Sequence, residues 1–518
     1  MRKPLLQNAA KMRVSDTDSV VAPVGGWNAR DPIGKMKKED AVILDNWFPT
    51  AADVAIRLGS DDHATGLPTI VESLMVYSSA TDEEMFAASG TAIYDVSAAG
   101  AIGAAAISGL NTAQWYHVNM TTAGGSFLYA FSGSDNPLLY DGSTWTAIDS
   151  VSTPAITGVT TSSLIFPTIW KRRLFLVEVN SMSVWYLPVD SIGGAASEIN
   201  FGPLFKLGGY IVAHANYTID GGEGMDDHYV IITSEGEVAV YKGTDPASAS
   251  TFALVGVFQV GAPIGRRCFT KIAGDLAIIT IDGVIPFSKA LVASRSSPVI
   301  ALTDKIRDAF STASRAYRLN YGWEGLLFPA GSFILFNIPV AAGSGQQQYV
   351  MNTTTSRWCR FKGWQANCWA MFNEEIYFGG DGVVTKAWTG QNDNGNDIVA
   401  DAKQAFSYFG SPGQIKLWKS ARPNLQSNGT VGAVIDLNVD FTDHEPMSYP
   451  SFSTITSSAW DSAVWDSSVW GGGLNTIKDW QTVSGEGYCA AFRMKCATNS
   501  ISIRWTATDY IFEKGGVI

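Results

Sequence analysis

The sequence has 518 residues, enough for two or more domains. Hydrophobic residues make up 46% and charged residues 16% of the chain, so it can bury a large core and is not a disordered protein. The net charge of −12, from 36 Lys and Arg against 48 Asp and Glu, argues against a clamp that holds nucleic acid by neutralising phosphates. DNA that passes by without binding is not excluded.

The 51 glycines and the 12% aromatic content favour an all-β fold. The cysteines are odd in number and contain no Cys-x-x-Cys pair, so we expect reduced thiols in a reducing compartment. The basic start, Met1–Arg13, has no apolar core of a signal peptide, and no apolar run reaches the ~18 residues that span a bilayer. We therefore expect folding in a cytoplasm and no membrane span. The five cysteines are Cys268, Cys359, Cys368, Cys489 and Cys496.

Residues 1–68 are predicted to be an N-terminal arm and anchoring segment. The first 20 residues are polar, and the apolar spacing within Lys35–Asn46 predicts a short helix. Pro49 limits any continuation of that helix. Three aromatic residues are expected to anchor the segment on the main body: Trp27, Trp47 and Phe48.

Residues 69–395 are predicted to form an irregular β-propeller of six or seven blades. The pattern is clearest in 218–290, where two apolar runs turn at Glu235-Gly236 and two more at Asp282-Gly283, about 47 residues later. An acid-Gly pair between β-rich runs is a hairpin signal, and a hairpin that recurs at this spacing is typical of propeller blades. The turn markers are Gly90, Gly133, Asn180, Gly236, Gly283, Gly343 and Gly382.

One helical insertion is expected near 302–317, because Ile306, Phe310, Ala313 and Tyr317 lie at helical spacing. Thr303 or Asp304 could cap it. An Asn/Asp/Gly-rich stretch at 390–400 predicts a domain boundary.

Residues 396–518 are predicted to form a C-terminal antiparallel domain like a β-sandwich. Its expected strands alternate between apolar and polar residues, as in Ile501, Ile503 and Trp505.

Three loops carry side chains that could do chemistry. Tyr140–Trp145 resembles the Asp-box turn of sialidase-type propellers but is one residue short, and it is interpreted as a hairpin tip. Gly221–His228 collects acids that could act as an acid/base pair, although a solvated loop is the simpler interpretation. Asp393–Asp397 has oxygen ligands at Ca²⁺-like spacing but lacks the rest of an EF-hand loop, so we interpret it as a linker.

No common catalytic motif occurs, and the five histidines are widely separated. We therefore assign no catalytic, cofactor-binding or metal-binding residue. In Ala459–Gly473, Trp460, Trp465 and Trp470 recur every five residues. This segment could pin a loop across the C-terminal domain, contact another subunit or stack on a sugar.

Several stretches resemble tail proteins of short-tailed bacteriophages and related prophages. These are Val24–Asn28 with Asp31-Pro32, Asp45–Pro49 and Arg57–Gly59; Ile232–Ala249 with Gly261–Arg267; and Phe406–Gly410, Ala421–Pro423 and the Trp-Asp repeat. The resemblance covers nearly the whole chain. It implies a propeller-containing tail nozzle that forms a hexameric ring at the distal end of the tail.

The first hypothesis is therefore a structural virion protein, a non-enzymatic ring subunit in the tail conduit for genome retention and ejection. The resemblance implies assembly in the host bacterial cytoplasm and contacts with tail or portal-adaptor proteins and tail fibres. Double-stranded DNA would pass without specific binding, and no cofactor is expected. The alternatives are a propeller-type glycan hydrolase or lyase and a non-catalytic receptor-binding tail protein, both acting at the host surface.

Overall fold

The computed structural model describes residues 15–220, 225–248, 250–272, 274–291, 301–341, 344–454 and 474–517. Strands account for 56% and helices for 6%, which confirms the predicted all-β class. Contacts divide the chain into two compact units: Leu58–Asn396, here called the propeller unit, and Met1–Arg57 with Asp397–Ile518, here called the terminal unit. Within the described ranges, no helix has the length and apolar character needed to cross a membrane.

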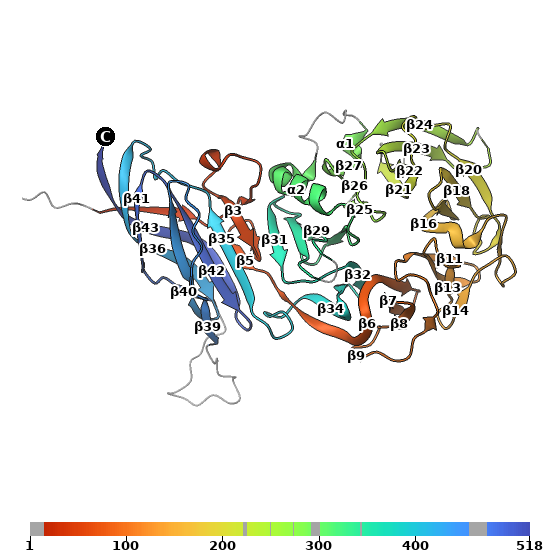
Figure 1. Ribbon diagram of the computed structural model, residues 1–518, viewed down its shortest axis with the longest axis horizontal. Coiled ribbons are helices and arrows are strands. Elements are labelled where there is room, and N and C mark those ends of the chain that lie inside the picture. Colours follow the sequence, from red (N-terminus) through yellow and green to blue (C-terminus); the bar gives the residue numbers. More distant parts are fainter. Residues whose placement is uncertain are drawn as a thin grey trace, which may run out of the picture. The chain divides into compact units, whose positions relative to one another are not determined.

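The propeller unit is a succession of small antiparallel sheets in a propeller-like arrangement, in which four blades are recognised (Figure 1). This count differs from the predicted six or seven, because one long strand fuses two sheets and other sheets are short or extended. Three sheets have four strands each: β11 Tyr116–Thr122, β12 Gly125–Phe131, β13 Leu138–Tyr140 and β14 Trp145–Ala147; β16 Leu164–Trp170, β17 Arg173–Glu178, β18 Ser183–Tyr186 and β20 Ser197–Asn200; and β21 Ile211–Asp220, β22 Met225–Thr233, β23 Glu237–Gly243 and β24 Phe252–Gln259.

The strand that fuses two sheets is β6, Gly59–Ser78. Its first part pairs with β34, with Asp62 opposite Thr385, and its second part pairs with β7, with Met75 opposite Phe86. The two sheets thereby become one eight-stranded sheet. Its other strands are β7 Glu83–Ser89, β8 Ala92–Asp95, β9 Gly100–Ala101, β10 Ile107–Ser108, β32 Cys368–Phe372, β33 Glu375–Gly379 and β34 Asp381–Thr389.

The rest of the propeller unit contains short antiparallel runs. One sheet has three strands, β25 Phe269–Ile272, β26 Asp275–Thr280 and β27 Gly283–Pro286. A further path runs through β28 Glu324–Phe328, β29 Phe333–Ile338, β30 Gln347–Asn352 and β31 Trp358–Lys362. Two minor strands, β15 Ile156–Thr157 and β19 Gly194–Ala195, pair in parallel, and a 3-10 turn, η2, spans Thr161–Ser163.

The predicted hairpin turns are present. Gly236 lies between β22 and β23 with φ of 81°, and Gly283 begins β27 with φ of 131°. These backbone angles lie in the region that residues other than glycine adopt only with strain. Among the remaining markers, Gly343 lies outside the described residues, and positive φ is found at Gly90, Gly133, Asn180 and Gly382.

The predicted helical insertion is confirmed as a 3-10 turn, η4 Leu302–Ile306, followed by α2 Arg307–Tyr317. Ile306, Phe310 and Ala313 are buried, as their spacing indicated. The expected cap is wrong, because neither helix has a side-chain N-cap, and the Thr303 hydroxyl instead accepts a hydrogen bond from the Val284 amide at 3.2 Å. One other short helix, α1, spans Phe287–Ala290.

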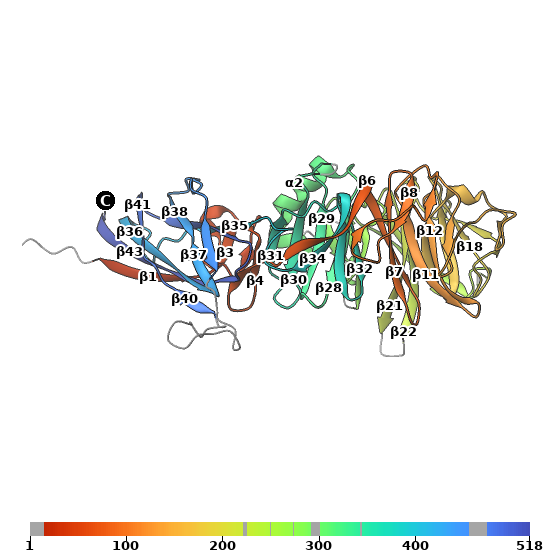
Figure 2. The same cartoon turned by 90° about the horizontal axis from the view of Figure 1, so that it is seen from below.

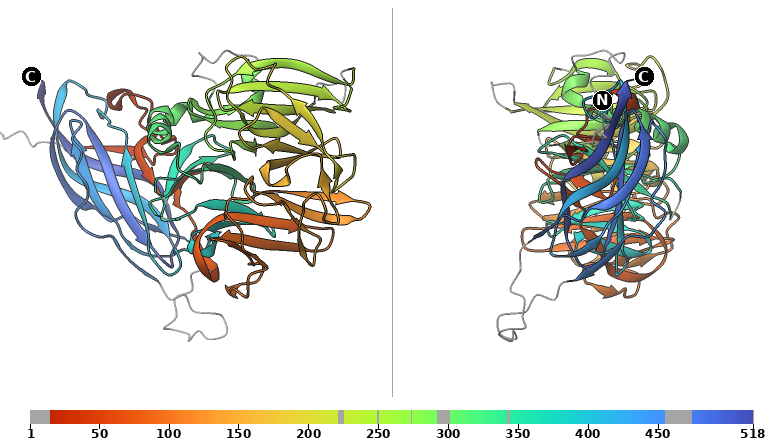
Figure 3. Two further views of the ribbon diagram at one scale, coloured as in Figure 1. Left: turned by 45° about the vertical axis from the view of Figure 1, so that its right-hand side comes forward. Right: turned by 90° about the vertical axis from the view of Figure 1, so that its left-hand side faces the viewer.

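The terminal unit consists mainly of antiparallel strands drawn from both ends of the chain, so β1, β36 and β43 run side by side (Figures 2 and 3). One sheet contains β1 Asp16–Val21, β4 Trp47–Pro49, β5 Val54–Ile56, β36 Gln414–Ser427, β40 Asn475–Ile477, β41 Gln481–Gly487 and β43 Ile503–Val517. Another set contains β2 Gly26–Trp27, β3 Asp40–Asp45, β35 Ile398–Gln404, β38 Val434–Val439 and β42 Ala490–Thr498, and a pair is formed by β37 Gly429–Gly432 and β39 Ser451–Thr454.

This organisation differs from the expected division into 1–68, 69–395 and 396–518. Asp16 in β1 lies opposite Phe512 in β43, so the N-terminal segment is built into the C-terminal strands rather than attached as an arm. The Trp47 ring lies 5.9 Å from the Trp505 ring, which shows what this aromatic anchor contacts.

The helix predicted for Lys35–Asn46 is wrong. Only a 3-10 turn, η1 Ile33–Lys35, precedes β3, and Asp40–Asp45 forms that strand. Short apolar runs do not separate helix from strand by periodicity alone. Here the β-branched pair Val42-Ile43 lies in a strand that pairs with β35, with Ile43 opposite Lys403.

The five cysteines are free and buried, as expected for reduced core thiols. The predicted alternation at the C-terminal end is also confirmed, because Ile501, Ile503 and Trp505 are all buried.

Gly236→Val and Gly283→Val are each expected to lower the free energy of unfolding by more than about 1 kcal/mol. Besides the strained φ, an added Cβ would approach Val260 O to 2.4 Å at position 236 and Thr303 Oγ1 to 2.7 Å at position 283. Gly274→Val is the matched control, because a Cβ there meets nothing within 4 Å. Chemical denaturation measures the effect, and equal stability of all three variants would contradict the turn assignment.

Candidate functional site

A polar cluster lies where the first strands of several propeller sheets converge. At its centre is Arg267, just before β25, whose side chain is only 14% exposed. Its Nη1 lies 3.2 Å from Oε2 of Glu324 in β28. Its Nη2 donates to Ser73 Oγ at 3.1 Å and to the carbonyl oxygens of Glu72 and Trp115 at 3.3 Å. One guanidinium therefore joins β6, the segment entering β11, and β28.

Aromatic rings complete the cluster. The guanidinium carbon lies 5.6 Å from the ring centroid of Tyr116 and 5.3 Å from that of Tyr321, distances typical of cation–π contacts. The Tyr321 hydroxyl donates to Glu72 O at 2.7 Å, and the Trp369 amide donates to Glu324 Oε2 at 3.1 Å. These contacts join β6, the segment before β11, β28 and β32 in one buried cluster.

Burial raises the pKa of Glu324, while the Arg267 guanidinium and the Trp369 amide oppose that rise. Burial also raises the pKa of Cys268 to about 12 and that of Cys368 to about 12. These thiols stay protonated at neutral pH and are poor nucleophiles. The cluster therefore has the character of a structural hub.

Two histidines near the converging strands are held neutral. Burial lowers the pKa of His214 to about 3, and burial together with Arg267 lowers that of His117 to about 4. Neutral His214 donates from Nε2 to Phe166 O at 2.6 Å and accepts at Nδ1 from the Tyr229 hydroxyl. Its lone pair is engaged, so His214 is not a general base.

The acids expected near His228 do not form an acid/base pair among the described residues. Residues 221–224 and the side chain of Asp226 lie outside the described part of the chain. Asp227 receives hydrogen bonds from Lys171 Nζ at 2.7 Å and Thr218 Oγ1 at 2.9 Å, and these hold its pKa below the usual range. Asp227 is therefore the ionised partner in an ion pair with Lys171.

The segment Tyr140–Trp145 is a hairpin tip between β13 and β14. Asp141 Oδ1 accepts from the amides of Ser143 at 2.9 Å and Thr144 at 2.8 Å, the pattern of an Asx turn. The turn is structural.

The linker Asp393–Asp397 uses its acids in hydrogen bonds. Asp393 Oδ1 accepts from Ser60 Oγ and Trp364 Nε1, each at 3.2 Å. The division between the two units falls after Asn396, inside this linker.

In the described ranges, no group of three or more His, Cys, Asp or Glu is placed to hold a metal ion. The Trp repeat of Ala459–Gly473 lies outside the described residues.

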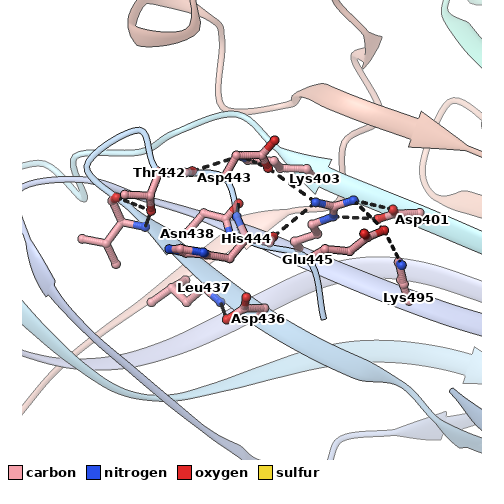
Figure 4. Close-up of polar contacts among 12 residues, drawn as sticks. Asp401, Lys403, Asp436, Leu437, Asn438, Thr442, Asp443, His444, Glu445 and Lys495 are labelled. Carbon is pink, nitrogen blue, oxygen red and sulfur yellow. Dashed lines mark hydrogen bonds and ion pairs between the residues drawn. The ribbon is translucent and has the colours of Figure 1, made fainter. Parts of the chain in front are cut away.

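A second charged cluster, which spacing in the sequence did not predict, lies in the terminal unit (Figure 4). Arg493 forms a bidentate pair with Asp401 at 2.7 and 3.1 Å. Lys403 pairs with Asp443 at 3.0 Å, and Lys495 pairs with Glu445. Three cations and three anions thus tie the loop after β38 to β35 and β42. The partners lie 40 to 92 residues apart, too far for spacing rules to detect.

Comparisons with known proteins leave the function open. No family model matches the chain, and no curated protein matches it. The chain is similar to the extracellular domain of a putative one-component system from B. thetaiotaomicron, with 10% identity and a TM-score of 0.39. The match covers 64% of this chain and 40% of that chain, so this chain spans less than half of that structure's length. A likeness this distant carries no argument about function.

Arg267→Met is expected to cost about 3 kcal/mol or more of stability, because it leaves the carboxylate of Glu324 without its cation. The double variant Arg267→Met with Glu324→Gln removes both charges and should recover at least about 1 kcal/mol of that loss. Denaturant titration of the single and double variants measures both effects. A double variant no more stable than Arg267→Met would contradict the ion-pair role.

Acid is expected to destabilise the propeller unit through His214. Its folded pKa lies below the ordinary value of about 6.5, so its contribution is fully present above that pH and is lost as pH falls toward about 3. Between about pH 7 and pH 5 the loss is about 2 kcal/mol. His214→Gln keeps a donor and an acceptor but cannot titrate. Over the same pH range this variant should therefore lose about 2 kcal/mol less stability than the unaltered protein. Equal losses in both proteins would contradict the assignment.

Proposed function

We propose that the chain is a structural virion protein, a non-enzymatic ring subunit of a bacteriophage tail of the nozzle kind. The observation that carries this proposal is the hub around Arg267, in which guanidinium, carboxylate and aromatic rings are engaged with one another. Such a centre suits a rigid scaffold better than an active site. The resemblance of the chain to tail proteins adds to this support.

The proposed DNA conduit would run between subunits rather than through one, because the Arg267 cluster joins strands from several sheets of a single propeller unit. A heterologous contact repeated by rotation closes a ring around a lumen, and the tail resemblance favours six copies. The net charge of −12 per chain opposes strong phosphate binding as the genome passes. The proposed partners are neighbouring tail or portal-adaptor proteins and tail fibres, in a virion assembled in the host bacterial cytoplasm.

We also propose a finer description of the fold. Four blades would be formed by β6–β10, by β11–β14, by β16–β18 with β20, and by β21–β24. The β25–β27 sheet, the β28–β31 path and the closing sheet of β32–β34 with β6 would bring the number to seven, within the six or seven expected. The terminal unit would be a β-sandwich. Its support is that Phe492 in β42 lies 5.8 Å from Trp505 and 6.2 Å from Tyr510, both in β43 of the facing sheet.

The outer strand β24 is the best candidate for part of the ring contact. It has eight residues, of which Leu254, Val255 and Val257 are at least 40% exposed, and it lies last in its sheet. The neighbouring outer strand β20 has four residues and is polar. An exposed apolar edge strand attracts another chain, and in a tail ring that chain is a second copy.

Light scattering and electron microscopy of the purified protein test the ring. We expect closed rings with six times the 55.6 kDa mass of the chain. Val255→Lys with Val257→Lys should shift the protein to folded monomers, because charges then face the contact. Ser197→Lys on β20 is the matched control and should leave rings intact.

Imaging of the assembled particle separates the remaining alternatives. A ring on the tail axis supports the proposal. Single copies at the tips of side fibres would contradict it and favour a receptor-binding tail protein. Release of reducing ends from host-surface polysaccharides by the purified protein would favour the glycan hydrolase.

A further inference from the structure

A cavity of about 300 Å³ lies between two hairpin turns of neighbouring sheets in the propeller unit. One turn joins β11 to β12, and the other joins β16 to β17. The volume is at the lower end of the range for small-molecule sites. Its lining residues are Met120, Thr121, Thr122, Ala123, Ile169, Arg172 and Asp190.

The lining combines apolar residues with one ion pair. Met120 is only 3% exposed, so the accessible apolar surface of the lining comes mainly from Ile169 and Ala123. Arg172 Nε donates to Asp190 Oδ1 at 2.8 Å, and its Nη2 donates to Asp190 Oδ2. The pair is bidentate and carries no net charge.

Three residues with positive φ also lie beside this cavity. Lys171, Arg172 and Asp190 have φ of 48°, 60° and 51°, although none is glycine. The Asp190 amide donates to Arg172 O at 2.8 Å, and Lys171 is anchored by its ion pair with Asp227. Lys171 and Arg172 form the hairpin turn between β16 and β17, and a two-residue turn of this kind requires positive φ at both positions. The turn places Arg172 beside the cavity, where its side chain is 75% exposed and that of Asp190 is 32% exposed.

We propose that this cavity binds a neutral sugar. Two of the five guanidinium N–H groups of Arg172 are used by Asp190, so three remain beside the unused lone pairs of the carboxylate. Adjacent donors and acceptors match vicinal hydroxyls, each of which both donates and accepts. Ile169 and Ala123 offer an apolar surface to the C–H face of the ring. This site lies beyond the proposed ring function and does not depend on it.

The internal ion pair determines the charge of the ligand. Because the pair carries no net charge, an anionic sugar gains no net attraction from Arg172 and is repelled by Asp190, and a cationic sugar is repelled by Arg172. A neutral sugar uses both partners without breaking their pair. Selectivity for neutral over charged sugars is therefore the signature of this site.

Saturation-transfer NMR tests the proposal with glucose, galactose, mannose and N-acetylglucosamine as neutral probes and glucuronate as the anionic probe. We expect at least one neutral probe to bind with a Kd on the order of 1 mM, and glucuronate to bind at least about tenfold more weakly. Ala123→Trp should abolish binding by filling the cavity. Ala80→Trp, at the exposed turn between β6 and β7, is the matched control and should bind as the unaltered protein does.

Asp190→Asn provides the second arm, because Asn tolerates the left-handed backbone and leaves the cation of Arg172 unneutralised. The preference should then shift toward glucuronate by about tenfold or more. The proposal is overturned if no neutral probe binds the unaltered protein, if Ala123→Trp binds as well as Ala80→Trp, or if Asp190→Asn leaves the preference unchanged.

Discussion

The propeller unit depends on the pairing of β6 with β34. These strands stand at opposite ends of the unit's sequence, and their pairing joins its first sheet to its last. The contact is close where β6 begins, because a Cβ at Gly59 would lie 1.7 Å from Asn392 O. Closure also brings the points where the chain enters and leaves the propeller to neighbouring strands. The segments before and after it can then pair with each other, as β1 does with β43.

Closure of the propeller unit explains how it can bury the positive charge of Arg267. Once the first strands converge, Arg267 finds Glu324, three acceptors and two aromatic rings that are distant from it in sequence. A buried cation is costly unless partners of this kind surround it. The buried Arg267 cluster therefore depends on the closed arrangement of sheets that supplies its partners.

Local chemistry made part of this structure predictable. Gly236 and Gly283 were identified because a tight turn needs positive φ, and α2 because Ile306, Phe310 and Ala313 share one helical face. Strand β3 was missed because its apolar run is too short for periodicity to decide, and pairing with β35 determined its state. Long-range partnerships left no local pattern to detect.

The candidate sites follow the same division. Asp141 was correctly interpreted as a turn residue, because its partners lie two and three positions away. The Arg267 hub, the Arg493 cluster and the cavity beside Arg172 assemble from distant segments, so spacing rules could not predict them. Amino-acid composition alone did not show whether a buried charged cluster would be structural or an active site.

The distribution of charge connects these features to the proposed role. Arg267 is balanced by Glu324, and Arg493, Lys403 and Lys495 are balanced by three carboxylates. These neutral clusters leave the excess of 12 negative charges unbalanced, which agrees with the proposal of a conduit that does not bind DNA. The Arg172–Asp190 cavity is neutral as well, and contacts with a neutral sugar are little affected by salt. Adhesion to a saccharide and release of DNA would therefore rest on different forces, and one ring could perform both without conflict.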